Sequence, residues 1–323
     1  MRKGVPGGAG CLVVLLCAVM CGAADDAMRA MRYAPGNEAS ARAWQAALRE
    51  RLRPLLRVED LAGRDIPLEP EFGEGRQESG YVIQEGRIRA TAGRKINVVV
   101  ARPDTGQSPF PSVICIHGHG GNRMTPFDAG AWEYKQFGAA LARRGFIVVS
   151  TDVGQHEVRE DGRTLMGERL WDLMRCVDYL ESLPDADPAR IGCAGLSLGG
   201  EMAMWLAAMD TRIAATVSAG FLTMMDQMEQ NHCMCWKFDG LRALVDFPDI
   251  YALIAPRPLQ CQNGLQEPEN QFTVSLARQA LAQITPAYAD LGAPENARLH
   301  VHDGGHEIDL DAMTAFLEAH LLR

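Results

Sequence analysis

The sequence predicts an α/β fold in which a mostly parallel sheet carries helices on both faces. From residue 112 onward, short continuous apolar segments alternate with segments of helical period, as in a parallel sheet covered by helices. Residues 81–103 alternate apolar and polar side chains and turn at residues 92–93, which is typical of antiparallel strands. We therefore expect one α/β domain that begins with antiparallel strands.

Six apolar segments are expected to form the main strands: residues 112–116, 146–151, 190–194, 214–218, 258–262 and 298–301. Helical periodicity predicts helices at residues 130–144, 165–182, 198–209, 270–283 and 307–321. A long insertion, residues 219–256, separates the fourth and fifth of these strands. Loops at the carboxyl ends of parallel strands enclose the ligand crevice in such sheets, so we expect this insertion to form a cap.

The N-terminus divides into two parts. Residues 1–24 have the pattern of a secretory signal peptide, with Arg2 and Lys3 before an apolar run and small residues at its end. We expect this segment to be removed and the mature protein to be exported, to the periplasm or outside the cell; a retained membrane anchor is the alternative. Residues 25–79 are expected to form a helical extension, because apolar residues recur at helical spacing within 37–57, and residues 80–323 to form the catalytic domain.

The charge pattern excludes two classes of partner. The 323-residue chain has a formal net charge of −9, and loss of residues 1–24 would make it −11. Lysine is scarce and no basic block is interleaved with aromatic residues, so nucleic acid and the membrane surface are not expected partners.

Nucleotide-binding motifs are incomplete in this sequence. Arg123 stands where a dinucleotide-binding loop would need its third glycine, and no lysine follows a glycine-rich loop. We therefore expect no nucleotide cofactor and, more broadly, no cofactor; the sequence indicates no oligomeric state.

The most informative stretch is the turn around Ser197. Residues 190–194 lead into the sequence Gly-Leu-Ser-Leu-Gly-Gly, and a helix is predicted immediately afterwards. This is a G-x-S-x-G motif in its required context of strand, sharp turn and helix. Gly195 and Gly199 leave room for the strained turn that raises the serine above the sheet. We predict that Ser197 is a catalytic nucleophile.

A serine hydroxyl needs a base to accept its proton, and the base needs an acid to orient it. His306 is the predicted base, because it follows the last predicted strand in a loop with two glycines; His302 is a weaker alternative. Glu267 is the predicted acid, because it lies in the loop after the strand 258–262; Glu269 is the alternative. The resulting order of serine, acid and histidine is the order in which hydrolases of this kind place them along the chain.

Acyl transfer also requires donors for a developing oxyanion. The segment "ICIHGHGGN", residues 114–122, ends a buried strand in glycines that leave main-chain N–H groups free. We expect the backbone N–H groups of Leu198 and His119 to form the oxyanion hole.

These motifs resemble those of the α/β-hydrolase superfamily. The shared marks are "HGHGG", "DPARIGCAGLSLGG", "IAPRPLQCQNG" and "DGGHE", within residues 80–323. They are most similar to the branch of acetyl xylan esterases, dienelactone-hydrolase-like proteins and the prolyl oligopeptidase catalytic domain. Two departures stand out: dienelactone hydrolases have a cysteine where this chain has Ser197, and this branch usually has an aspartate where this chain has Glu267. The resemblance implies ester hydrolysis, often of acyl groups on carbohydrate.

The stretch "NHCMCWKF", residues 231–238, looks like a metal or redox site. A Cys-x-Cys pair with one adjacent histidine lacks a second ligand pair at the usual spacing, so we expect no metal there; a disulfide from Cys233 or Cys235 to another cysteine is the alternative. We interpret the stretch as part of the cap, with Trp236 as a substrate contact. His119, Asp152 and His156 are the other predicted substrate-binding residues.

The sequence thus predicts an exported serine esterase that acts through a Ser-His-Glu triad on small esters or acylated carbohydrate. Two alternatives remain open. The first is a serine peptidase of the prolyl oligopeptidase type, which we expect less because residues 25–79 are too few for the propeller-sized N-terminal domain that many of those relatives use to select peptides. The second is a non-catalytic binding module that retains the fold.

Overall fold

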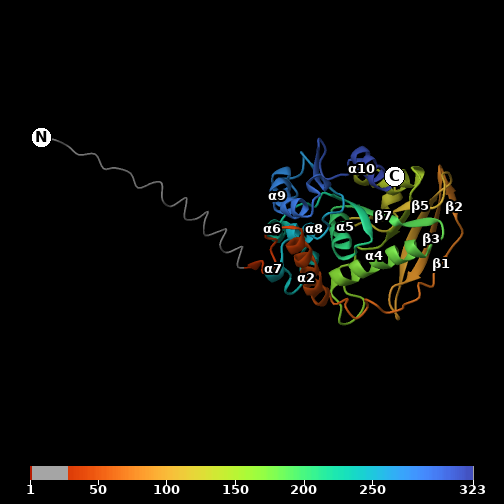
Figure 1. Cartoon of the computed structure of the whole chain (residues 1–323). Coiled ribbons are helices and arrows are strands. Elements are labelled where there is room, and N and C mark those ends of the chain that lie inside the picture. Colours follow the sequence, from red (N-terminus) through yellow and green to blue (C-terminus); the bar gives the residue numbers. More distant parts are fainter. Residues whose placement is uncertain (2–27, 323) are drawn as a thin grey trace.

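A mixed ten-stranded sheet runs through the computed structural model, which describes residues 1 and 28–322 (Figure 1). Its strands are β1 (Glu71–Phe72), β2 (Arg76–Glu78), β3 (Tyr81–Arg89), β4 (Lys95–Pro103), β5 (Phe110–Ile116), β6 (Ile147–Thr151), β7 (Ala186–Leu196), β8 (Ile213–Ala219), β9 (Leu259–Gly264) and β10 (Ala297–His302). The order across the sheet is β1-β3-β4-β6-β5-β7-β8-β9-β10, with β2 paired to β3. Strands β5 to β10 are parallel, and β1 to β4 are antiparallel to their neighbours. The predicted fold class is confirmed.

Helices cover both faces of this sheet. They are α2 (Glu38–Leu56), α3 (Phe137–Arg143), α4 (Leu165–Ser182), α5 (Leu198–Met209), α6 (Met225–Asn231), α7 (Leu241–Leu244), α8 (Phe247–Ala252), α9 (Val274–Asp290) and α10 (Leu310–Leu321). Helices α2, α4, α5, α8 and α9 share one hydrophobic core, and α3 and α10 share another on the opposite face. Strand β5 contributes side chains to both cores. Ile114 and Ile116 pack into the first core, and Val113 and Cys115 pack into the second on the opposite face.

Most predicted elements form close to their predicted positions, and α4 and α5 begin and end at the predicted residues. The single helix predicted at 130–144 is wrong. The chain instead forms a 3₁₀ turn, η2 (Trp132–Tyr134), followed by α3. Lys135 and Gln136 lie between them with φ of 53° and 50°, a left-handed conformation that interrupts a right-handed helix. Strands β1 and β2 lie before residue 80, where the catalytic domain was expected to begin.

The N-terminal helix α2 is an integral part of the core. Asn37 caps it, with its side chain accepting a hydrogen bond from the Ser40 backbone N–H. Leu48, Leu52 and Leu56 are fully buried on its inner face. The Gln45 amide donates to the carbonyl of Ala255 at 2.7 Å, and thereby ties α2 to the end of the insertion.

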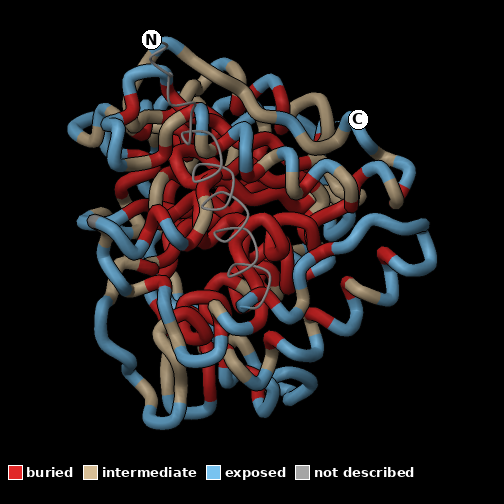
Figure 2. The backbone as a smooth tube through the Cα atoms, turned by 90° about the vertical axis from the view of Figure 1, so that its left-hand side faces the viewer, coloured by how far each residue is buried: buried red, intermediate tan, exposed pale blue. Residues whose placement is uncertain are grey.

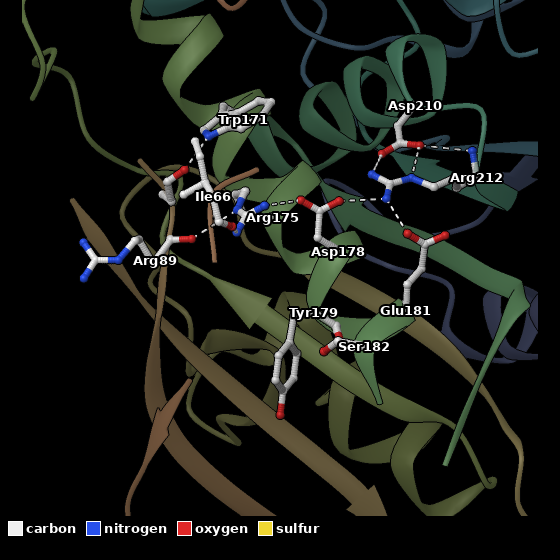
Figure 3. Close-up of polar contacts among 11 residues, drawn as sticks. Ile66, Arg89, Trp171, Arg175, Asp178, Tyr179, Glu181, Ser182, Asp210 and Arg212 are labelled. Atoms are coloured by element: carbon white, nitrogen blue, oxygen red, sulfur yellow. Dashed lines mark hydrogen bonds and ion pairs between the residues drawn. The ribbon is translucent and has the colours of Figure 1, made fainter. Parts of the chain in front are cut away.

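Helix α4 is fixed to the rest of the molecule by a polar network (Figure 3). The Trp171 indole N–H donates to the Ala90 carbonyl at 2.7 Å. Arg175 donates to the Ile66 carbonyl at 2.6 Å and pairs with Asp178. Asp178 also accepts from Arg212 beyond α5, so this face of α4 links the antiparallel strands to the far end of α5.

The buried segments lie at the centre of the molecule, and exposed residues lie at its periphery (Figure 2). Within residues 28–322, no helix is both long and apolar enough to cross a membrane. The signal peptide predicted for residues 1–24 lies outside the described residues, Met1 apart.

We predict that Leu52→Ala destabilises the whole domain, because it leaves a cavity where α2 meets the core. The expected loss is about 2–5 kcal/mol in the free energy of unfolding, measured by denaturant titration. Arg51→Ala, at the exposed neighbouring position, is the matched control and should change it by less than about 0.5 kcal/mol. Equal, small effects of the two substitutions would show that α2 is a detachable appendage.

Candidate active site

Ser197 lies at the sharp turn between β7 and α5. Its backbone has φ of 61° and ψ of −124°, a strained conformation that directs the side chain out of the sheet. A Cβ at Gly195 would lie 2.4 Å from the Gly199 carbonyl oxygen, and a Cβ at Gly199 would lie 2.2 Å from that of Ile116. Neither position can hold a side chain. The glycines of the motif are therefore needed for β5, β7 and α5 to meet at this point.

The loop after β5 passes directly over the serine. A Cβ at Gly118 would lie 3.1 Å from the Ser197 Cβ and 2.6 Å from the Tyr134 hydroxyl. The Gly118 backbone N–H donates to that hydroxyl at 2.8 Å, so this N–H is already engaged. The next residue, His119, lines the same pocket as Ser197 and Leu198, the two positions that flank the start of α5.

His306 and Glu267 are hydrogen-bonded to each other. The His306 Nδ1 lies 2.9 Å from Glu267 Oε1 and 3.2 Å from Oε2. The Glu267 side chain is 1% exposed, whereas that of His306 is 29% exposed and lines the pocket beside Ser197. The alternative acid, Glu269, is exposed and has no such contact. Phe272 stacks on the His306 ring with centroids 5.4 Å apart and fixes its plane.

The loops that carry this pair are tied together by their backbones. The Leu265 N–H donates to the His302 carbonyl at 2.8 Å, and the Gln266 N–H donates to the Gly304 carbonyl at 3.0 Å. A Cβ at Gly264 would lie 2.2 Å from the Gly304 oxygen, so only glycine allows this approach. Gly220, at φ of 59°, likewise makes room for the His306 ring.

These residues line a pocket of about 320 Å³. The elements β7, α5, α6, η2 and the loops after β5 and β9 contribute its walls. Its lining residues are His119, Glu133, Tyr134, Leu196, Ser197, Leu198, Glu201, Phe221, Met228, His232, Cys233, Gln271, Phe272 and His306. The insertion 219–256 supplies four of them, in agreement with its expected place above the serine.

Three predicted substrate contacts lie elsewhere. Trp236 is fully buried and packs against Phe247, with ring centroids 5.5 Å apart, so the prediction that it contacts substrate is wrong. A large indole stabilises the insertion more by filling its core than by facing solvent. Asp152 accepts a hydrogen bond from the Arg123 backbone N–H at 2.8 Å and holds the loop after β5. His156 does not line the pocket; its Nε2 lies 3.2 Å from the Cys233 sulfur.

Other histidines have structural roles. His117 is fully buried; its Nε2 accepts from the Val153 N–H at 3.0 Å, and its Nδ1 donates to the Gly118 carbonyl. It therefore joins the loops after β5 and β6. His300 lies 2.8 Å from an Asp309 carboxylate oxygen. His302, the weaker alternative base, accepts from the Gly304 N–H and does not line the pocket.

Three residues that shape the pocket were not predicted from the sequence. Tyr134 ends the 3₁₀ turn η2 and Phe272 lies in a bend before α9, and their places in the pocket depend on long-range packing. Glu201 lies one turn into α5, where its backbone N–H donates to the Ser197 carbonyl. Its side chain is 1% exposed, and its Oε1 has no hydrogen-bond partner. A glutamate four residues after the serine could have been noticed, because that spacing places both on one face of a helix.

The chain is similar in sequence to known hydrolases. Residues 96–232 match the model of the Dienelactone hydrolase family, a segment that includes Ser197 and His119 but neither Glu267 nor His306. The "Putative hydrolase YtaP" of Bacillus subtilis (strain 168) is 26% identical over 271 residues, which are 75% of this chain and 88% of that protein.

Solved structures share most of this architecture. A "putative acetyl xylan esterase" from Bacteroides fragilis NCTC 9343 superposes with a TM-score of 0.71 at 19% identity, covering 88% of this chain and 82% of that one. A glucuronoyl esterase from Solibacter usitatus superposes with a TM-score of 0.70 at 16% identity, covering 91% and 97%. The chain has the α/β-hydrolase fold, and the match of residues 96–232 to the dienelactone hydrolase model agrees with the resemblance seen in its motifs.

Glu201 generates a prediction about pH. Burial raises the pKa of its carboxyl to about 8 from the ordinary 4.5, against the opposing effect of the nearby Arg169 charge. The folded state thus keeps a proton that the unfolded chain loses above pH 4.5, and this contribution to stability falls as pH rises from about 4.5 to 8. We predict that Glu201→Gln removes this fall. Between pH 5 and pH 8, the unfolding free energy of the variant should therefore rise by at least about 1 kcal/mol relative to that of wild type. Denaturant titrations across this pH range measure both proteins. If the unfolding free energies of wild type and the variant changed in parallel with pH, a raised pKa of Glu201 in the folded state would be contradicted.

Proposed function

We propose that this ester hydrolase of the α/β-hydrolase fold is an exported serine esterase that removes short, acetyl-type acyl groups from carbohydrate through a Ser197–His306–Glu267 triad. The observation that carries the proposal is the convergence of three chain segments on one pocket. The strained Ser197 turn lines it, and His306 enters it with its far nitrogen held by the buried Glu267.

In the first half of the reaction, the Ser197 hydroxyl attacks the ester carbonyl carbon while His306 accepts its proton. The tetrahedral intermediate then collapses. The alcohol oxygen leaves with the proton from His306, and the acyl group stays bound to Ser197. In the second half, His306 deprotonates a water that attacks the acyl carbon, and the carboxylic acid leaves as Ser197 regains its proton.

Glu267 orients His306 and stabilises its positive charge. Its carboxylate accepts the Nδ1 proton of His306, which leaves the opposite nitrogen free to accept a proton from the serine. When His306 becomes positively charged, the buried carboxylate stabilises that charge. A glutamate side chain is one methylene longer than the aspartate usual at this position. The backbone hydrogen bonds between the two loops hold Glu267 and His306 at the separation that this longer side chain spans.

The backbone N–H groups of Leu198 and His119 are the proposed oxyanion donors. Leu198 is the first residue of α5, where main-chain N–H groups and the helix dipole favour negative charge. The Gly118 N–H is occupied by Tyr134, which supports the choice of His119 in the same loop. Two donors of this kind typically contribute about 3 kcal/mol each to transition-state stabilisation.

The pocket favours a small, uncharged acyl group. Its volume of about 320 Å³ suits a short acyl chain with part of an alcohol, and Phe221, Met228 and Phe272 give it apolar walls. Its lining includes Glu133 and Glu201 but no lysine or arginine among the described residues, so a negatively charged acyl group would find no counter-ion. Several structural neighbours are named as esterases of carbohydrate, which supports an acylated sugar as the alcohol side. The signal-like residues 1–24 support export.

We predict that wild type hydrolyses acetylated sugars and short nitrophenyl esters faster than a methyl glucuronate ester or an aminoacyl amide. Ser197→Ala should lower kcat by at least about 10³-fold and abolish labelling by a fluorophosphonate probe, because no other group supplies the nucleophile. Initial rates on this panel and in-gel fluorescence give the measurements. Amide turnover above ester turnover would favour the peptidase, and no labelling of folded wild type would indicate a binding module.

We predict that Glu267→Gln lowers kcat by about 10²–10⁴-fold with little change in KM, because an amide can hold His306 in the wrong tautomer. The neighbouring Glu269→Gln is the matched control and should stay within about twofold of wild type, since its side chain is exposed. Steady-state kinetics on the best acetyl ester decide between them. A larger loss in the Glu269 variant would assign the acid to that residue.

A further inference from the structure

Two histidines and two cysteines converge at the rim of the serine pocket. One ligand atom from each of His119, His156, Cys233 and Cys235 lies within 4.8 Å of all the others. The His119 Nε2 is 3.2 Å from the Cys235 sulfur, and the His156 Nε2 is 3.2 Å from the Cys233 sulfur. The two pairs lie side by side, with histidine ring centroids 5.6 Å apart.

Three separate segments supply these side chains. His119 lies in the loop after β5, His156 in the loop after β6, and both cysteines at the 3₁₀ turn η3 (Met234–Trp236) of the insertion. His232, the histidine adjacent to the cysteines in sequence, is not part of the group; its Nε2 lies 2.7 Å from the Gln227 amide nitrogen. The missing second ligand pair, which made a metal site unexpected from the sequence, is thus provided by residues 77 and 116 positions away.

We propose that His119, His156, Cys233 and Cys235 form a tetrahedral binding site for a divalent metal ion of the zinc class. Two thiolates and two neutral imidazoles are a donor set that zinc binds with four-coordinate geometry. Two thiolates also balance the charge of the ion.

The spacing suits such an ion. Zn–S bonds of about 2.3 Å and Zn–N bonds of about 2.0–2.1 Å place neighbouring ligand atoms about 3.3–3.8 Å apart in a tetrahedron. The two N···S distances of 3.2 Å are already close to this edge length, and no two of the four ligand atoms are more than 4.8 Å apart. Side-chain rotations that contract the group by about 1 Å would complete the coordination shell.

Arg169 donates a hydrogen bond to one of the two cysteines. It is fully buried in α4, and its Nη1 donates to the Cys235 sulfur at 3.5 Å. Its Nη2 donates to the Gln155 carbonyl, so one guanidinium contacts Cys235 and the backbone directly before His156. A cationic donor to a ligating sulfur stabilises the thiolate form and fixes its orientation.

The site would be structural. All four positions of the tetrahedron are taken by protein atoms, which leaves none for substrate or water. The ion would fasten the insertion to the loops that carry His119 and Asp152. Because His119 and Cys233 also line the pocket, the ion would hold this part of the pocket wall in place, while the ester chemistry remains with Ser197.

The test measures metal in the purified full-length chain after incubation with zinc and desalting. We expect about one zinc per chain in wild type and in His232→Gln, the matched control from the same turn. Cys233→Ser and His156→Gln should retain less than about a tenth of this amount. Mass spectrometry of the dissolved metal gives the stoichiometry.

Cobalt substitution of wild type gives a readout independent of any variant's folding. We expect the intense visible bands of tetrahedral Co²⁺ and a thiolate-to-cobalt charge-transfer band, both displaced by zinc. Thermal unfolding of wild type should shift upward with added zinc, because the ion binds the folded state.

The proposal would be overturned if reduced, folded wild type retained no zinc, if the cobalt spectrum were octahedral, or if the Cys233→Ser, Cys235→Ser double variant retained zinc in full. A Cys233–Cys235 disulfide that forms in preference to metal binding, detected by thiol titration, would also overturn it. Fluorophosphonate labelling of Ser197 is scored separately, so failure of the metal site and failure of the esterase are distinguishable.

Discussion

The close approach of β5, β7 and α5 at Ser197 is the constraint on which the rest of the structure depends. The Gly199 Cα lies so near the Ile116 carbonyl that no side chain fits between them, and Gly118 passes directly over the serine. This contact fixes where the nucleophile stands and where the loop after β5 can present its N–H groups. It also explains why strain is tolerated at Ser197: buried strands on both sides hold the turn in place.

The remaining parts of the pocket are brought to that fixed point by backbone pairing between loops. The strand pair β9 and β10 is parallel and in register to its last residues, so the loops with Glu267 and His306 leave the sheet together. Glycines at 220 and 264 let these loops approach without collision. The insertion lines part of the pocket, and its buried Trp236 packs into the core that α2, α4, α5, α8 and α9 share.

Much of this site could be predicted because its signals are local. Ser197 is identified by glycines two positions before and after it, and His306 and Glu267 follow recognisable strands. Trp236 was misplaced because a tryptophan in a long insertion has the same sequence signature whether it faces a ligand or a core. Tyr134 and Phe272 were missed because their positions in the pocket depend on how distant elements pack, whereas Glu201 was missed although its spacing from Ser197 is a local signal.

The sequence by itself determined the α/β architecture, the ends of α4 and α5, and the turn that displays Ser197, since hydrophobic period and glycine placement act over a few residues. Only the tertiary structure decided which side chains meet across the sheet's carboxyl edge. Cys233 and Cys235 find their histidines 77 and 116 residues away because parallel strands bring their following loops to one edge. That adjacency is set by strand order, which no local pattern encodes.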